Sequence, residues 1–312
     1  MADKTSSVIT GSVIQEMKLP DAAIGLTEST SRAIAQNIQW ANVELPTGQV
    51  ATSYVCQGKG TPVLLLHGFD SSLFEFRRLI AELAQHAQVW AMDLLGFGFS
   101  DRTATPEVNP ALIKQHILAF CQQVIGQSVV LVGASMGGGA AIDFATSYPD
   151  QVKKLVLIDA VGFASGPAVG KFMFSPLDKW ATNFLRSAGV RRKISEKAYY
   201  DNSFVTPDAS LCASLHLLMP NWQEALIAFT KSGGYNFLSS RVGQISMPTL
   251  VIWGRHDKIL GYKDASRFER AISNCKLVWV ENCGHVPHLE KAQITAAHIA
   301  AFLDPQKAIA LE

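Results

Sequence analysis

A serine lies between small residues in the segment GASMG (133–137), directly after the apolar run 129–132. The run is aliphatic and β-branched, as expected of a strand that is covered on both faces of a parallel sheet. A sharp turn from strand to helix leaves no room for side chains two positions before and after the serine, and Gly133 and Gly137 provide that room. The turn would present the Ser135 hydroxyl at a helix N-terminus, which favours developing negative charge. The pattern therefore predicts a nucleophilic serine.

A serine hydroxyl needs a general base, and the base needs an acidic partner that fixes its tautomer. Asp257 follows the buried run 249–253, and His285 follows the next predicted strand, 276–280. The ends of successive parallel strands meet at one edge of a sheet, so Ser135, Asp257 and His285 are expected to lie together. Their order along the chain, serine then acid then histidine, is the order expected of a triad on such a sheet.

Each member of this triad also has a structural interpretation. Asp257 could cap the following helix, and His285 could be a hydrogen-bonded loop histidine. Asp159 ends another predicted strand and is an alternative acid. The three residue types in this order, each after a core strand, favour the catalytic interpretation.

The segment HGFD (67–70) follows the buried run 63–66 and completes the candidate site. Acyl transfer places negative charge on a carbonyl oxygen, and two preorganised backbone N–H groups should meet that charge. We assign these groups to Phe69 and Met136. His67 is interpreted as a buried structural donor in the same loop.

Strand-like and helix-like segments alternate through residues 42–161 and again through 246–304, which predicts βαβ units and a parallel sheet forming one core. The alternation stops at residues 162–245, where helix-like segments follow one another, so we expect an inserted helical cap. Residues 1–41 are predicted to be an N-terminal extension, and 305–312 a C-terminal tail. Within the extension and the cap, helices are expected at 31–40, 171–188, 194–200, 207–219 and 223–231.

Composition excludes several classes of protein. The 312 residues are 48% hydrophobic and 17% charged with a net charge of +1, so neither disorder nor a nucleic-acid partner is indicated. The short basic run 191–193 is interpreted as a solvated helix end. The five cysteines are odd in number and widely spaced, which favours neither a disulfide framework nor a zinc site. No metal or other cofactor is expected.

No secretory signal and no membrane-spanning run is found in the sequence, so we expect a cytoplasmic protein. The predicted helix near residues 31–40 carries apolar side chains. These could pack on the core, or they could give residues 1–40 a weak association with a partner or a membrane surface.

At this point the chain resembles the α/β-hydrolase superfamily. The resemblance implies an α/β fold with a mostly parallel eight-stranded sheet flanked by helices, a cap after the sixth strand, and a catalytic triad. It does not extend well to residues 1–40, and the cap is too variable to indicate a substrate. The segments that carry it are LLLHGFDSS (64–72), MDLLGFGFSD (92–101), LVGASMGGGAA (131–141), VIWGRHDKIL (251–260) and ENCGHVPHLEKA (281–292).

The resemblance also narrows the reaction. Haloalkane dehalogenases and epoxide hydrolases place aspartate at the nucleophile position, so Ser135 favours acyl chemistry. We predict hydrolysis of a small-molecule carboxylic ester through an acyl-enzyme. Carbon–carbon bond hydrolases of ring-cleavage products are an alternative, because they share the SMGG elbow, although their glycine-rich oxyanion loop is not found in HGFDSS. A haloperoxidase-like side activity and a non-enzymatic ligand-binding role are further alternatives.

The predicted cap is rich in large apolar side chains. Most of these are expected to pack between the cap helices and the core. Because pockets are largely lined by such side chains, some are also candidates to bind an apolar acyl or alcohol group. The candidates are Phe172, Trp180, Phe184 and Trp222.

Overall fold

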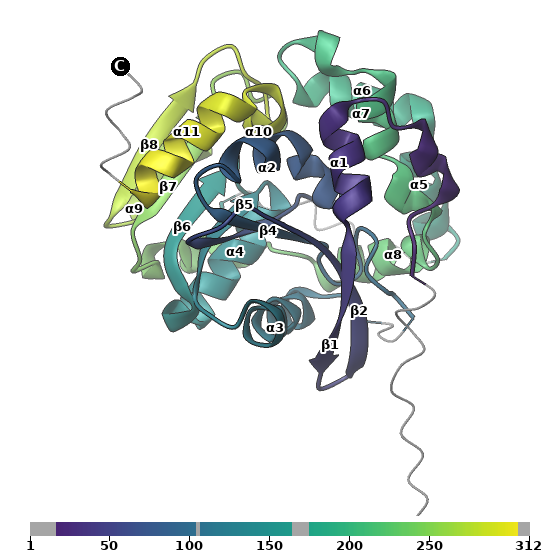
Figure 1. Cartoon of the computed structure of the whole chain (residues 1–312), viewed down its shortest axis with the longest axis horizontal. Coiled ribbons are helices and arrows are strands. Elements are labelled where there is room, and N and C mark those ends of the chain that lie inside the picture. Colours follow the sequence, from purple (N-terminus) through teal and green to yellow (C-terminus); the bar gives the residue numbers. More distant parts are fainter. Residues whose placement is uncertain (1–16, 104–106, 164–174, 305–312) are drawn as a thin grey trace, which may run out of the picture.

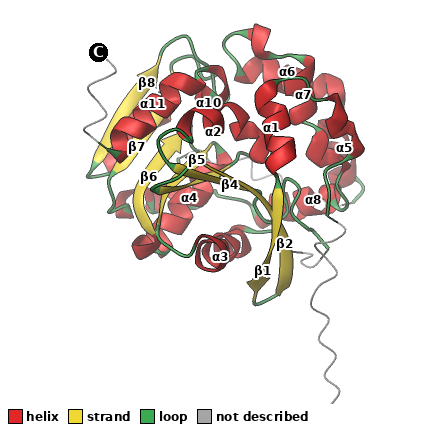
Figure 2. Ribbon diagram, in the orientation of Figure 1, coloured by secondary structure: helices red, strands yellow, loops and turns green. Residues whose placement is uncertain are grey.

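The computed structural model of this chain describes residues 17–103, 107–163 and 175–304. An eight-stranded sheet lies between two groups of helices (Figure 1 and Figure 2), which confirms the predicted α/β architecture. The strands are β1 (Gln39–Leu45), β2 (Gly48–Gln57), β3 (Pro62–Leu66), β4 (Gln88–Met92), β5 (Val129–Ala134), β6 (Val152–Ile158), β7 (Thr249–Gly254) and β8 (Cys275–Val280).

The strand order in the sheet is β1-β2-β4-β3-β5-β6-β7-β8. β1 and β2 form an antiparallel hairpin that begins at Gln39, earlier than the predicted start at 42, and β2 is also antiparallel to β4. All other neighbouring strands are parallel. The loops after β3, β5, β7 and β8 therefore follow carboxyl ends along one edge of the sheet, where sites of α/β proteins usually form.

Helices cover both faces of the sheet, and further helices follow β6. In the described residues they are α1 (Ser29–Asn37), α2 (Arg77–Leu83), α3 (Pro110–Phe120), α4 (Met136–Ser147), α5 (Leu177–Arg186), α6 (Ala188–Ala198), α7 (Pro207–Cys212), α8 (Trp222–Ser232), α9 (Lys263–Ala271), α10 (Pro287–Glu290) and α11 (Ala292–Leu303).

Each face of the sheet has its own hydrophobic core. Leu64 and Leu66 of β3 pack into the core that includes residues of α3, α4 and α9, whereas Val63 and Leu65 pack into the core that includes α1, α2 and α11. In Figure 1, α3 and α4 lie on one side of the sheet and α2 and α11 on the other. The uninterrupted aliphatic run of β3 is thus explained by burial on both faces.

The segment between β6 and β7, residues 162–245, is called the cap below. Its described part contains α5 to α8 and short 3₁₀ turns, and no strand. The helix predicted at 171–188 begins, in the described residues, at Leu177 and ends at Arg186. Ser187 adopts an extended conformation (φ −57°, ψ 128°) and α6 starts directly after it, so the predicted segment 194–200 forms the end of a longer helix.

The described part of the N-terminal extension is attached to both the cap and the core. The side chain of Asp208, in cap helix α7, accepts hydrogen bonds from the backbone N–H groups of Thr27 and Glu28 (2.6 and 2.9 Å) at the start of α1. Ile34 of α1 is buried in the core shared with α2. Asp208 thus caps a helix that has no capping side chain of its own. None of the helices described is long and apolar enough to cross a membrane.

Candidate active site

Ser135 lies in the turn between β5 and α4 with a positive φ of 51° and ψ of −118°. This is a strained conformation for a residue with a side chain. The turn is tight because β5 and α4 pack closely. A Cβ on Gly137 would lie 2.0 Å from the carbonyl oxygen of Leu66, and one on Gly133 would lie 2.3 Å from that of Gly137. Only glycine fits at these two positions, as the sequence pattern requires.

Asp257 and His285 meet across the loops after β7 and β8. Nδ1 of His285 lies 2.9 Å from Oδ2 of Asp257, and both side chains are buried. The other carboxylate oxygen of Asp257 accepts the N–H groups of Ile259 and Leu260 (2.7 and 3.1 Å). Burial would raise the pKa of Asp257, but the hydrogen bond and charge of His285 lower it below its usual value. An ionised Asp257 fixes the proton on Nδ1 and leaves the lone pair on Nε2.

Asp159, the alternative acid, lies beside this pair at the end of β6. Both of its oxygens accept the N–H of Gly254 (3.1 and 3.2 Å). Complete burial, together with the negative charge of Asp257, raises the pKa of Asp159 well above its usual value. Asp159 therefore favours the protonated form and Asp257 the ionised form. Of the two candidate acids, Asp257 is the one that forms the hydrogen bond to His285.

The HGFD loop runs alongside Ser135. A Cβ on Gly68 would lie 3.4 Å from the Cβ of Ser135. The N–H of Gly68 donates to Oε2 of Glu75 (2.9 Å), and Oε1 of Glu75 lies 3.0 Å from Nε2 of His288. Burial would raise the pKa of Glu75, but His288 and further partners hold it at about 2. This anchor fixes the loop that carries Phe69, whose N–H and that of Met136 are the candidate oxyanion donors.

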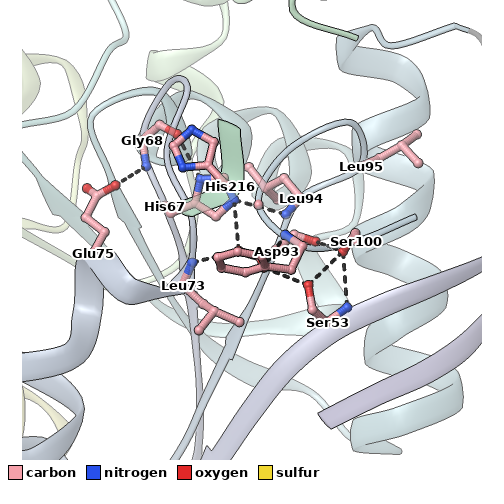
Figure 3. A network of polar contacts seen from close by, with 12 residues as sticks. Ser53, His67, Gly68, Leu73, Glu75, Asp93, Leu94, Leu95, Ser100 and His216 are labelled. Carbon is pink, nitrogen blue, oxygen red and sulfur yellow. Dashed lines mark hydrogen bonds and ion pairs between the residues drawn. The ribbon is translucent and has the colours of Figure 1, made fainter. Parts of the chain in front are cut away.

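Behind this loop lies a fully buried polar network, drawn in Figure 3. Nε2 of His67 accepts the N–H of Leu94 (3.1 Å), so the proton is on Nδ1, which lies 2.8 Å from the carbonyl oxygen of Gly68. Asp93 accepts the Ser53 hydroxyl (2.6 Å) and the N–H of Leu73 (2.6 Å). The network joins β2, the loop after β4 and the HGFD loop, and His67 is a structural member of it.

Asp70, directly after Phe69, connects the loop to the cap. Its carboxylate accepts hydrogen bonds from Arg191 (2.7 Å) and from the indole Nε1 of Trp222 (2.7 Å), and Nε2 of His216 lies 3.2 Å away. Burial opposes ionisation, but these partners hold the pKa of Asp70 at about 2. The interpretation of 191–193 as a solvated helix end is wrong for Arg191, which also donates to the carbonyl oxygen of Ala213 (2.7 Å).

No signal in the sequence identified this cluster. Asp70 is more than a hundred positions away from its partners in the sequence. An arginine within a basic run looks the same whether it is solvated or paired. Trp222 is predicted to line the substrate pocket. In the structure it is buried, and its indole N–H donates to Asp70 instead.

A cavity of about 310 Å³ lies between the core and the cap and is bordered by both Ser135 and His285. Its wall is mostly apolar. Of the four predicted pocket residues, Phe172 lies outside the described residues. The other three, Trp180, Phe184 and Trp222, do not line this cavity. Trp180 and Phe184 are 70% and 56% exposed on α5. The apolar wall is formed by Phe69, Phe74, Leu185, Ile194, Ala198, Val205, Ala209, Cys212, Ala213, Ile259, Val286 and Leu289.

The cap also contacts the histidine loop directly. The N–H of His285 donates to the carbonyl oxygen of Ala198 at the end of α6 (2.7 Å). A Cβ on Gly284 would lie 2.2 Å from the same oxygen, so this approach requires glycine. The position of the candidate base therefore depends on the cap as well as on the sheet.

One group of side chains in the described residues has a spacing that could hold a metal ion. Asp159, Asp257 and His285 can each place a ligand atom within 4.8 Å of the others. The Nδ1 to Oδ2 hydrogen bond uses two of these residues, and a protonated Asp159 is a poor ligand. The donor set therefore fits a triad better than a metal centre.

Fold and site together define an α/β hydrolase with a serine at the candidate nucleophile position. The model of the alpha/beta hydrolase fold family matches residues 61–292, and this chain belongs to that family. The alpha/beta hydrolase domain-containing protein VTE7 of Arabidopsis thaliana is 31% identical over 294 residues, which cover 91% of this chain and 89% of that protein.

One further relative and one solved structure of similar fold differ in the reactions that their names give. A 2-hydroxymuconate semialdehyde hydrolase of Pseudomonas putida is 28% identical, over 79% of this chain and 88% of that protein. The structure of a thermophilic esterase from Thermogutta terrifontis superimposes with a TM-score of 0.73, at 22% identity, over 86% of this chain and 98% of that one. At 22% identity, the similarity to the esterase structure concerns the fold alone.

Proposed function

We propose that this protein is a serine hydrolase that cleaves a carboxylic ester through an acyl-enzyme on Ser135. One observation carries the proposal. The bond from Nδ1 of His285 to Asp257 leaves Nε2 as the base, and His285 borders the same cavity as Ser135. A base oriented by an acid beside a serine on a strained turn is the arrangement that nucleophilic acyl transfer needs.

The reaction follows from these positions. Ser135 attacks the ester carbonyl while His285 accepts its proton, and the N–H groups of Phe69 and Met136 stabilise the tetrahedral oxyanion. His285 then gives the proton to the departing alkoxide, which leaves as the alcohol. Water, activated by the same histidine, attacks the acyl-enzyme, and the carboxylic acid is released with Ser135 restored.

The cavity supports an ester with an apolar group. Twelve of its lining residues are apolar, and they come from both the core and the cap, so we assign residues 162–245 the role of a cap over the site. A volume of about 310 Å³ lies at the small end of the range for ligand pockets. Short and medium acyl chains should therefore be better substrates than long ones.

The test is hydrolysis of p-nitrophenyl acetate, butyrate, octanoate and palmitate by the wild-type protein and by Ser135→Ala. The proposal expects hydrolysis with an optimum below palmitate and its loss in the variant. A folded wild-type protein that hydrolyses none of these esters would contradict the esterase proposal and would favour carbon–carbon bond hydrolysis or a ligand-binding role. The chain-length optimum also measures the part of the cavity that the acyl group occupies.

Cleavage of a carbon–carbon bond beside a ketone is a second candidate, favoured by the relative from Pseudomonas putida. The same serine, histidine and aspartate would serve, because a ketone carbonyl is attacked like an ester carbonyl. The measurement is the loss of absorbance of 2-hydroxymuconate semialdehyde in the presence of the protein. If this substrate is consumed and the p-nitrophenyl esters are not, the second candidate replaces the first.

A further inference from the structure

Glu290 is a buried acidic residue that the proposed reaction does not use. It is the last residue of α10 and is only 4% exposed. It does not line the cavity that Ser135 and His285 border, so contact with a substrate there is not its role. A buried carboxylate is costly unless hydrogen-bond donors surround it, and the donors around Glu290 therefore indicate what it does.

The carboxylate of Glu290 joins the cap to the loop that carries His285. Oε2 accepts the N–H of Gly284 (2.8 Å), the residue directly before His285. Oε1 accepts the N–H of Asp201 (2.7 Å), and the backbone nitrogen of Tyr200 lies 3.1 Å from both oxygens. Both cap residues follow the end of α6, 90 and 89 positions from Glu290. One side chain thus connects two segments that are far apart in the sequence.

Three consecutive residues that end at His285 are each bound through the backbone to a different part of the molecule. The carbonyl oxygen of Cys283 accepts an N–H from the loop after β7 (2.9 Å). The N–H of Gly284 donates to Glu290, and the N–H of His285 donates to the carbonyl oxygen of Ala198 at the end of α6 (2.7 Å). The first and third contacts join two backbone groups. Of the three, the contact with Glu290 is the one that a side-chain substitution can remove.

In the proposed reaction, the imidazole of His285 has to serve two partners at once. Nδ1 bonds to Asp257 (2.9 Å), and Nε2 has to face the hydroxyl of Ser135. One ring can do both only if the backbone that carries it is fixed. A displacement of about 1 Å at a reacting group can lower the rate about a hundredfold. A contact on the residue next to His285 therefore affects the rate of the reaction as well as the stability of the fold.

We propose that Glu290 is a positioning residue for His285, which it holds in place by binding Gly284 and the cap segment 200–201 with one carboxylate. This inference rests on the proposed function, in which His285 is the base. Glu290→Gln keeps the shape of the side chain but has one acceptor oxygen instead of two. That oxygen can serve the cap or Gly284, and the NH₂ group then faces an N–H donor on the other side. The substitution should therefore disconnect the cap from the histidine loop.

The first test is the kinetics of p-nitrophenyl butyrate hydrolysis. In Glu290→Gln we expect kcat to fall by about 10- to 100-fold with little change in KM, because the base is displaced. Asp208→Asn is the matched control. Asp208 is also a buried carboxylate that accepts two backbone N–H groups, those of Thr27 and Glu28, but these lie in the N-terminal extension and not in the histidine loop. Asp208→Asn should keep kcat close to the wild-type value.

An equal fall of kcat in the two variants would overturn the proposal, because it would show a general loss of stability. A rise in KM alone in Glu290→Gln would overturn it as well, because the effect would then be on the cavity wall.

The second test observes the Nδ1 proton of His285 by proton NMR. A proton between an imidazole and a carboxylate resonates far downfield, and Asp257→Asn, which removes the carboxylate, identifies the signal. We expect this signal to shift in Glu290→Gln and to stay unchanged in Asp208→Asn. A loss of stability without a change in the position of His285 would leave the signal in place. An unmoved signal in folded Glu290→Gln would therefore overturn the proposal.

The NMR test needs no substrate, so it separates this inference from the proposed function. If the wild-type protein hydrolyses no ester but the signal shifts in Glu290→Gln alone, the esterase proposal fails and the positioning role is supported. If Glu290→Gln does not fold, Glu290→Asp takes its place, because its carboxylate is one methylene shorter and cannot reach both sides. The same fall in kcat and the same shift are expected from Glu290→Asp, and wild-type values for both would overturn the proposal.

Discussion

Nη1 of Arg191 donates a 2.7 Å hydrogen bond to Oδ2 of Asp70, which joins helix α6 of the cap to the loop beside Ser135. Trp222 of α8 binds the other oxygen of the same carboxylate. Asp70 itself has a positive φ of 48°, a conformation that is unfavourable for a residue with a side chain. The candidate oxyanion donor Phe69 is the preceding residue, so the loop that carries it is attached to the cap through Asp70.

We predict that Asp70→Asn lowers kcat/KM at least tenfold and reduces the free energy of unfolding by about 3 kcal/mol, because the buried charge of Arg191 loses its partner. Ester hydrolysis and denaturant unfolding measure the two effects. Arg192→Gln is the control, since Arg192 is exposed and pairs with Glu196 on the surface. Unchanged activity in Asp70→Asn would show that the cap and the oxyanion loop are not coupled through this residue.

Substitution of the neighbouring residues Asp159 and Asp257 should have very different effects on kcat. Asn is a close mimic of a protonated aspartic acid, so Asp159→Asn should keep kcat within about threefold. Asp257→Asn should lower it by about 10⁴, as loss of the orienting acid does in other triads. Kinetics of the two purified variants at neutral pH test whether Asp257 is the acid that orients His285. A comparable loss of kcat in both variants would refute this assignment.

Stability in acid should depend on Glu75 and Asp70. The pKa of each is lowered to about 2 in the folded protein, from ordinary values of 4.5 and 3.8. Groups with a lowered pKa stabilise the fold above the unfolded value, and this contribution is lost as pH falls toward the folded value. The free energy of unfolding should therefore decrease between about pH 5 and pH 2.

Urea unfolding across this range measures the slope. Glu75→Gln should give a shallower decrease than the wild type. Glu281→Gln, at an exposed surface pair with Arg255, should leave the decrease unchanged. If Glu75→Gln and wild type show the same slope, Glu75 is not the ionised anchor of Gly68.

The close packing at the nucleophile turn predicts opposite effects for two glycine substitutions. A methyl group on Gly137 would lie 2.0 Å from the Leu66 carbonyl oxygen, so Gly137→Ala should destabilise the protein by about 3 kcal/mol or more. Gly189 lies in α6 with no atom near the position of a Cβ, so Gly189→Ala should stabilise by up to about 1 kcal/mol. Thermal unfolding of the two variants checks both signs, and a fully stable Gly137→Ala would contradict the described turn.

The sequence was sufficient for the sheet and for the positions of Ser135, Asp257 and His285. Uninterrupted aliphatic strands and glycines at a tight turn are local features, and the order of segments then places their loops at one edge of the sheet. Local pattern and global fold agree in this part of the chain.

The cap and its contacts could not be predicted in the same way. Trp222 and Phe184 are both large and apolar, yet one binds Asp70 in the interior and the other is 56% exposed. Hydrophobicity along a helix gives its buried face but not which partner covers it. The role of Arg191 likewise depends on Asp70, which is more than a hundred positions away in the sequence, and no spacing rule connects the two residues.

The central claim is an acyl-enzyme on Ser135, and mass spectrometry of the protein quenched in acid during turnover of p-nitrophenyl butyrate tests it most directly. We predict a butyryl adduct on the peptide that contains Ser135, and no adduct in Ser135→Ala. Hydrolysis that continues in Ser135→Ala, or an adduct on another residue, would contradict the account.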